Sequence, residues 1–84
     1  DGNIHVNIML DRGLPGAEAR AEAALDDLFQ QVLAWDGAVT GEHGIGIAKA
    51  RWWPQAADES VRELHHRVKM ALDPRRILNP GKFV

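Results

Sequence analysis

The stretch GEHGIG, residues 41–46, places a carboxylate beside an imidazole in a loop rich in glycine. Glycine adopts backbone angles that side chains forbid, so such a loop can be bent to a shape that serves function. Histidine and carboxylate groups bind metals, and a histidine that titrates near neutral pH suits a general base. Taken alone, an acid–histidine pair in a loop is more often structural or solvated. Because neighbouring loop residues can point apart, Glu42 and His43 could serve these two roles separately.

A second candidate lies near the start of the chain. Residues 4–10, IHVNIML, alternate apolar and other side chains, which predicts a half-buried strand. His5 and Asn7 then share the face opposite the apolar one. A lone strand histidine is more often a surface or hydrogen-bonded residue than a ligand.

Two other motifs are weaker candidates for a functional site. The glycines of residues 41–46 do not match the dinucleotide-binding pattern G-x-G-x-x-G, so we discard a phosphate cradle. His65 and His66 are adjacent in a predicted helix and point about 100° apart, so they cannot converge on one ion. They are typical of a solvated helix face.

The elements that must position these residues alternate along the chain. Residues 17–35 predict a helix whose apolar stripe includes Leu25, Leu28, Val32 and Trp35, and which ends at 36–37. Residues 38–40 predict a short second strand that leads into the glycine loop. Residues 47–53 predict one or two helical turns, ended by Pro54.

A second long helix is expected from Asp58, a good N-cap, to the stop at Asp73-Pro74. Its predicted buried stripe consists of Val61, Leu64, Val68 and Ala71 or Leu72. The remaining residues, 75–84, predict an irregular and partly apolar tail. The three tryptophans are expected to be packing groups.

The resulting order, β-α-β-α plus a tail, predicts an α+β fold with helices on one face of a small sheet. Two short strands make a poor sheet by themselves. We therefore expect either dimerisation through strand edges or neighbouring strands from residues upstream. The chain has no initiator Met and opens directly into a strand pattern, which suggests a fragment of a longer protein.

The bulk composition limits the function classes. Eighty-four residues make at most one small domain, and the absence of cysteine excludes disulfides and thiolate metal sites. A net charge of −2, with no basic stripe, argues against nucleic-acid binding. No apolar run approaches the roughly 20 residues of a membrane span, and no secretory signal is present.

Three motifs together carry a family resemblance: DGNIHVNI, GAVTGEHGIGIAK and LDPRRILNPGKFV. In order and spacing they resemble the C-terminal part of FAD-linked oxidases, the group of D-lactate dehydrogenases, the glycolate oxidase flavoprotein subunit and D-2-hydroxyglutarate dehydrogenases. The resemblance implies that residues 1–84 are a single C-terminal segment, part of a cap domain and half of a ferredoxin-like unit. The FAD-binding domain would then lie upstream and be absent.

The resemblance also implies roles for single residues. His5 matches the second of two metal-ligand histidines, of which the first would precede Asp1, and Glu42 matches a third metal ligand. Asn7 resembles a residue that binds the substrate carboxylate or hydroxyl. His43 resembles the base that removes the hydroxyl proton.

Two further positions, Lys49 and Asn79, lie in motifs that run near the flavin in the complete enzymes. The implied activity is FAD-dependent oxidation of a 2-hydroxy acid, with hydride passing from C2 to the flavin. A divalent metal such as zinc or manganese would act as a Lewis acid. Which acid is oxidised is left open, and the isolated segment is expected to be inactive.

Two alternatives remain at this point. The chain could be a stand-alone oligomerisation or partner-binding module that keeps the motifs as scaffold. It could also be a small metal-binding hydrolase with His5, Glu42 and His43 as ligands. For the oxidase, we expect an upstream FAD-binding domain as partner, formation of a homo-oligomer, and a cytoplasmic location, with any membrane association arising through partners.

Overall fold

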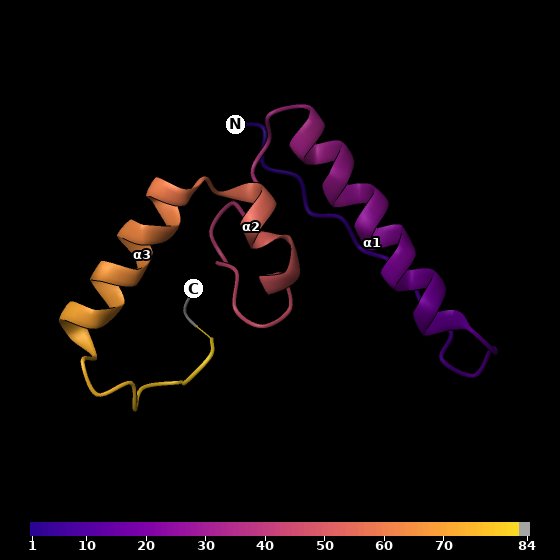
Figure 1. The fold of residues 1–84 in the computed structure, drawn as a ribbon. Helices are drawn as coiled ribbons and strands as arrows, with labels where there is room; N and C mark the ends of the chain where they lie inside the picture. The colour runs from indigo at the N-terminus through magenta and orange to yellow at the C-terminus, as the bar shows by residue number, and fades with distance from the viewer. Residues whose placement is uncertain (83–84) are drawn as a thin grey trace. The chain divides into compact units, whose positions relative to one another are not determined.

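All regular secondary structure in residues 1–82, the part described by this computed structural model, is helical (Figure 1). The chain divides into two compact units, Asp1–Gly37 and Ala38–Val84. Because residues 1–82 contain no strand, the predicted α+β class, with its β-α-β-α half of a ferredoxin-like cap domain, is wrong. The chain is helical instead, with irregular connections.

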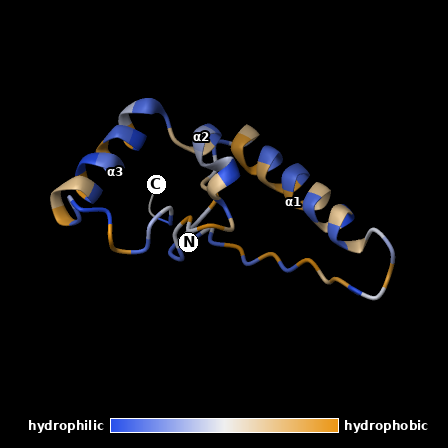
Figure 2. Ribbon diagram, turned by 60° about the horizontal axis from the view of Figure 1, so that its bottom comes forward, coloured by the Kyte–Doolittle hydropathy of each residue, from blue (hydrophilic) through white to orange (hydrophobic). Residues whose placement is uncertain are grey.

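The strand predicted for residues 4–10 is extended backbone without a partner. Hydropathy alternates along it as predicted, and the segment runs beside α1 in both views (Figures 1 and 2). A strand needs a neighbour that accepts and donates its backbone hydrogen bonds, and no ladder forms here. Ile4, Val6 and Ile8 therefore stay exposed.

The first helix, α1, spans Ala17–Ala34 and confirms the prediction to within one residue. Beyond it the chain turns through Asp36 at φ 60°, and the Gly37 N–H donates to the Val32 carbonyl at 2.9 Å. These bonds satisfy carbonyls that the helix end leaves without partners. Trp35, expected on the buried stripe, is 75% exposed.

The second short strand, predicted for residues 38–40, is wrong as well, because this segment is irregular. Val39 is nevertheless buried and belongs to the small core of the second unit, together with Trp52 and Ala57. Trp52 thus confirms its expected packing role.

Pro54 begins a helix instead of ending one. The 3-10 helix η1, Ala50–Trp52, leads directly into α2, Trp53–Ala56, in which Pro54 stands in the first turn. A proline is tolerated there because the first N–H groups of a helix have no intrahelical acceptor. The helical turns before Pro54 are real, but the predicted stop is wrong.

The last helix, α3, spans Glu59–Leu72 as predicted. The Asp58 side chain caps it by accepting the Val61 N–H at 2.9 Å. Its expected buried stripe is wrong, since Val61, Leu64, Val68 and Leu72 are exposed. His65, expected to be solvated, is half-buried instead, and its ring lies 4.8 Å from the Trp53 ring.

The tail after α3 forms no helix or strand through residue 82, as predicted, but it is made of two defined turns. In the first, the Arg76 N–H donates to the Asp73 carbonyl at 3.0 Å. In the second, the Lys82 N–H donates to the Asn79 carbonyl at 3.2 Å, with Pro80 and Gly81 in the central positions. Gly81 has φ 78°, the pattern of a type II turn. Residues 83 and 84 of the predicted tail lie outside the described part.

Candidate functional site

The GEHGIG loop is held at both ends by buried residues. Val39 precedes it and Trp52 follows it, with 7% and 3% of their surfaces exposed. The loop itself is closed by a hydrogen bond of 2.9 Å from the Gly44 N–H to the Thr40 hydroxyl oxygen. The core of the second unit therefore anchors a short loop that protrudes from it.

Glycine is required in this loop for its backbone angles. Gly44 has φ 80° and Gly46 has φ 57°, both in the left-handed region that side chains disfavour. A Cβ atom at either position would meet no atom within 4 Å. Within this chain the constraint is one of angle, and the space beside both residues is open.

Glu42 and His43 project from this loop into solvent. Their side chains are 71% and 74% exposed, and Glu42 Oε1 lies 3.9 Å from His43 Nε2. That distance allows electrostatic attraction when the imidazole is protonated, but it exceeds a hydrogen bond. Both groups are therefore accessible to a substrate or an ion.

The two site residues predicted near the start of the chain lie in the first unit. His5 and Asn7 are exposed on the extended segment of the first unit, whereas Glu42 and His43 belong to the second unit. Glu42 and His43 therefore lie beside each other in the second unit, and His5 and Asn7 lie in the first. Within residues 1–82, no group of three or more histidine, aspartate or glutamate side chains is arranged to hold a metal.

Lys49 lies three residues beyond the end of the glycine loop. Its N–H donates to the Ile45 carbonyl at 3.2 Å, and its carbonyl accepts the Trp52 N–H at 3.1 Å. Lys49 is half-buried at the start of η1. Its position therefore follows from the same anchoring that fixes the loop.

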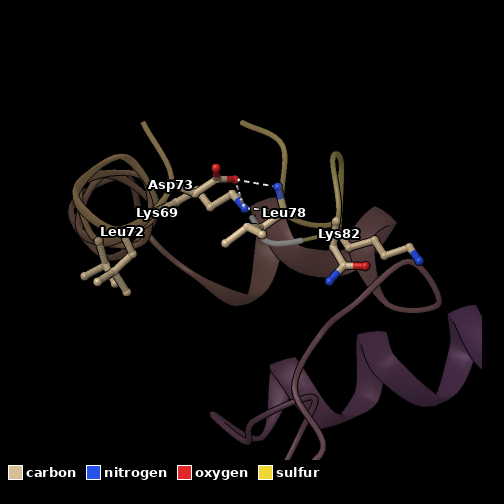
Figure 3. Close-up of a pocket in the computed structure, with 7 residues that line it drawn as sticks. Lys69, Leu72, Asp73, Leu78 and Lys82 are labelled. Atoms are coloured by element: carbon tan, nitrogen blue, oxygen red, sulfur yellow. Dashed lines mark hydrogen bonds and ion pairs between the residues drawn. The ribbon is translucent and has the colours of Figure 1, made fainter. Parts of the chain in front are cut away.

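Asn79, the last predicted site residue, lies in the tail of the second unit. Its φ of 43° is left-handed, a conformation that asparagine tolerates better than most residues. It helps to line an open pocket of about 510 Å³ between the end of α3 and the tail (Figure 3). The full lining comprises Val68, Lys69, Leu72, Asp73, Leu78, Asn79 and Lys82.

A buried carboxylate, Asp73, organises this pocket at a position that the sequence pattern predicts only as the end of a helix. Asp73 Oδ1 accepts the Ile77 N–H and Oδ2 accepts the Leu78 N–H, each at 3.0 Å. Lys69 Nζ lies 2.7 Å from Oδ2 and donates to the Leu78 carbonyl at 2.6 Å. The dashed lines in Figure 3 mark the contacts among Lys69, Asp73 and Leu78. A lysine four residues before an aspartate at a helix end was the available signal.

The charge state of Asp73 follows from these contacts. The hydrogen bond from the Lys69 ammonium has the largest effect and lowers the pKa of the carboxyl below its ordinary value. Burial opposes this shift, while the Leu78 and Ile77 N–H groups support it. The carboxylate is therefore anionic at neutral pH and balanced by Lys69.

Comparison with known proteins places these features in a family context. The family described as FAD linked oxidases, C-terminal domain, matches residues 1–83. A probable mitochondrial D-lactate dehydrogenase of Danio rerio is 38% identical over 100% of the chain and 17% of its own length. The glycolate oxidase subunit GlcD of Bacillus subtilis is 35% identical over 99% of the chain and 18% of its own length. A D-2-hydroxyglutarate dehydrogenase of Xanthomonas citri is 37% identical over 99% of the chain and 18% of its own length.

The chain therefore spans less than a fifth of the length of these relatives. No solved structure matches it. Within residues 1–82, none of the helices has the length and apolar character needed to cross a membrane.

Proposed function

Because the chain belongs to the C-terminal domain family of the FAD-linked oxidases, we propose that the full-length protein is a flavin-dependent 2-hydroxy-acid dehydrogenase. Relatives named as D-lactate dehydrogenase, glycolate oxidase subunit and D-2-hydroxyglutarate dehydrogenase support this class of substrate. The observation that carries the proposal within this chain is the exposed Glu42–His43 pair on an anchored glycine loop. The alternative of a stand-alone binding module has no comparable support.

In this proposal His43 accepts the proton of the substrate's 2-hydroxyl group. A neutral imidazole can accept a proton through its unprotonated ring nitrogen. As the proton leaves oxygen, the C2–H bond breaks with its electron pair and the hydroxyl becomes a carbonyl, giving a 2-oxo acid. FAD, when bound, supplies the acceptor for that hydride. Asn7 is assigned to the substrate's carboxylate or hydroxyl.

Lys49 and Asn79 are assigned to the flavin. Lys49 lies at the start of η1, three residues after the loop that carries His43, and a lysine there can donate to polar flavin atoms. Asn79 offers both an amide donor and an acceptor at a pocket. Both residues belong to segments of the second unit whose backbone is held by hydrogen bonds.

A divalent metal such as zinc or manganese is proposed only for the full-length protein. His5 and Glu42 have the right donor chemistry, imidazole nitrogen and carboxylate oxygen. The described residues do not complete such a site, because no group of three ligands forms among residues 1–82. Metal content measured after His5→Ala and Glu42→Gln would test the ligand assignment.

Three further expectations belong to the full-length protein: an FAD-binding domain upstream of this segment, a homo-oligomeric state and a cytoplasmic location, with any membrane association through partners. Size-exclusion chromatography with light scattering tests the second. Cell fractionation tests the third.

The decisive experiment follows the flavin of the full-length FAD-loaded protein. D-Lactate, glycolate or D-2-hydroxyglutarate is added without oxygen, and bleaching of the visible flavin band is timed. We expect one acid to bleach the wild type and His43→Gln to be slowed about 100-fold or more, the usual contribution of a general base. His66→Gln, an exposed histidine on α3, is the matched control and should behave as wild type.

Two outcomes would contradict the proposal. If none of the acids bleaches the flavin, the substrate class is wrong. If one acid bleaches wild type and His43→Gln at the same rate, the substrate class stands but His43 is not the base.

A further inference from the structure

The residue before Asn79 is fixed from both sides. The Leu78 N–H donates to Asp73 Oδ2 at 3.0 Å, and the Leu78 carbonyl accepts from Lys69 Nζ at 2.6 Å. Since Lys69 Nζ also lies 2.7 Å from Asp73 Oδ2, the three groups form a closed triangle. Neither peptide group of Leu78 can rotate without breaking a charge-assisted hydrogen bond.

The carboxylate of this cluster is shielded from solvent, whereas Leu78 itself is exposed. The side chains of Lys69 and Asp73 are 19% and 3% exposed, so water and salt screen their attraction little. Both carboxylate oxygens have partners, because the Ile77 N–H takes Oδ1. A buried charge with all its partners in place is costly to disturb.

A second ion pair on α3 shows by contrast what a merely surface pair looks like. Arg67 and Glu63 have the same four-residue spacing and a distance of 2.9 Å, but their side chains are 75% and 53% exposed. Such pairs contribute little to stability. The hydrogen bond of this pair joins the two side chains within α3, so it does not fix the tail.

We infer that Asp73 and Lys69 are positioning residues for Asn79, holding Leu78 so that the Asn79 side chain is presented at the pocket. The inference rests on the proposed role of Asn79 at the flavin. Fixing Leu78 sets the direction in which the chain enters the left-handed Asn79 and the turn at residues 79–82. Figure 3 shows Asp73, Lys69, Leu78 and Lys82 around the same pocket.

The test measures the dissociation constant of FAD in the full-length protein, from the flavin fluorescence during titration of apoprotein. Asp73→Asn keeps the shape of the side chain but loses its charge, and Lys69→Met loses the ammonium. We expect each to raise the dissociation constant about tenfold, the effect of one charge-assisted hydrogen bond. Lys69→Arg should restore most of the affinity, and Arg67→Met is the matched control that should leave it unchanged.

A double variant, Asp73→Asn with Asn79→Asp, separates positioning from general destabilisation. Asn79→Asp keeps a residue type that tolerates the left-handed angle but removes the amide donor. If Asp73 acts through Asn79, the dissociation constant of FAD for the double variant is no higher than that of whichever single variant binds FAD more weakly. Additive losses would overturn the inference, because they mean that Asp73 acts independently of Asn79.

The remaining outcomes distinguish this inference from the proposed function. If Asn79→Asp weakens FAD binding but Asp73→Asn and Lys69→Met do not, the positioning role is wrong and the flavin contact stands. If Asn79→Asp leaves FAD affinity unchanged, the flavin contact itself is wrong and the inference falls with it. Should Asp73→Asn fail to fold, the pair Lys69→Met and Lys69→Arg decides the question.

Discussion

Two acid–base pairs in the second unit show how solvent exposure separates two uses of the same chemistry. Glu42 and His43 are 3.9 Å apart on an exposed loop, so neither is committed to the other. Asp73 and Lys69 are 2.7 Å apart and shielded, and both also bond to backbone. The first pair is suited to receive a substrate, and the second to hold a segment in place.

The left-handed angle of Gly44 leads to a prediction at the residue scale. In the full-length protein, Gly44→Ala should lower the free energy of unfolding by about 1 kcal/mol, the cost of placing an ordinary residue at positive φ. Gly44→Asn should lose less, because asparagine tolerates that region. Urea unfolding of the three proteins measures both effects. Equal losses for alanine and asparagine would show that the added volume, and not the angle, causes the strain.

At the scale of the elements, the sequence correctly predicted the helix ends, which local hydrogen bonds determine. Asp58 marks the start of α3, and the stops at residues 36–37 and 73–74 are correct because caps and prolines act on their immediate neighbours. The prediction of a strand at residues 4–10 was wrong because a strand depends on a neighbouring strand, which the hydropathy pattern cannot identify. The prediction of a buried stripe on α3 was wrong for the same reason. Periodicity shows which face of a helix is apolar but does not show what covers that face.

The candidate site was predictable to a similar extent. The glycine loop and its acid–histidine pair are visible in the sequence, because residue type and adjacency are enough to find them. The spacing of Lys69 and Asp73 is visible as well, but the bonds from Asp73 to backbone groups four and five residues later are not, because that segment has no periodicity. Such contacts depend on the path of an irregular chain.

The end of α3 should respond to acid. The folded-state pKa of Asp73 lies below its ordinary value of 3.8, so its contribution to stability is complete above that pH. The contribution is lost as the pH falls through the lowered folded-state pKa. We therefore expect the difference in urea midpoint between wild type and Asp73→Asn to shrink below about pH 4. A difference that stays constant down to pH 2 would mean that the charge of Asp73 is not what stabilises the tail. Glu63→Gln, at an exposed pair, is the control.

At the scale of the whole molecule, the chain carries proposed site residues on two separate units and spans less than a fifth of its relatives. The Glu42–His43 pair is open to water. Catalysis of hydride transfer needs a site that orients the reactants and excludes solvent. Under the proposed function, the 84 residues would supply only parts of the site, and its enclosure would come from elsewhere in the full-length protein.

This leads to a prediction for the segment by itself. The isolated 84-residue chain, mixed with FAD and each of the three 2-hydroxy acids, should show no substrate-dependent reduction of a redox dye. The full-length protein in the same assay is the positive control. Reduction by the isolated chain would show that these residues alone form a working site.

The open space beside Gly44 has a consequence for handedness. Position 44 restricts the angle of the backbone but not the volume of the residue, since a Cβ atom would touch nothing within 4 Å. The natural L-amino acids strain there, whereas a D-amino acid prefers positive φ. A semisynthetic chain with D-alanine at position 44 should keep the loop's shape and lose glycine's excess freedom in the unfolded state. The loop thus discriminates by chirality, and glycine occupies this position as the one genetically encoded residue that is not chiral.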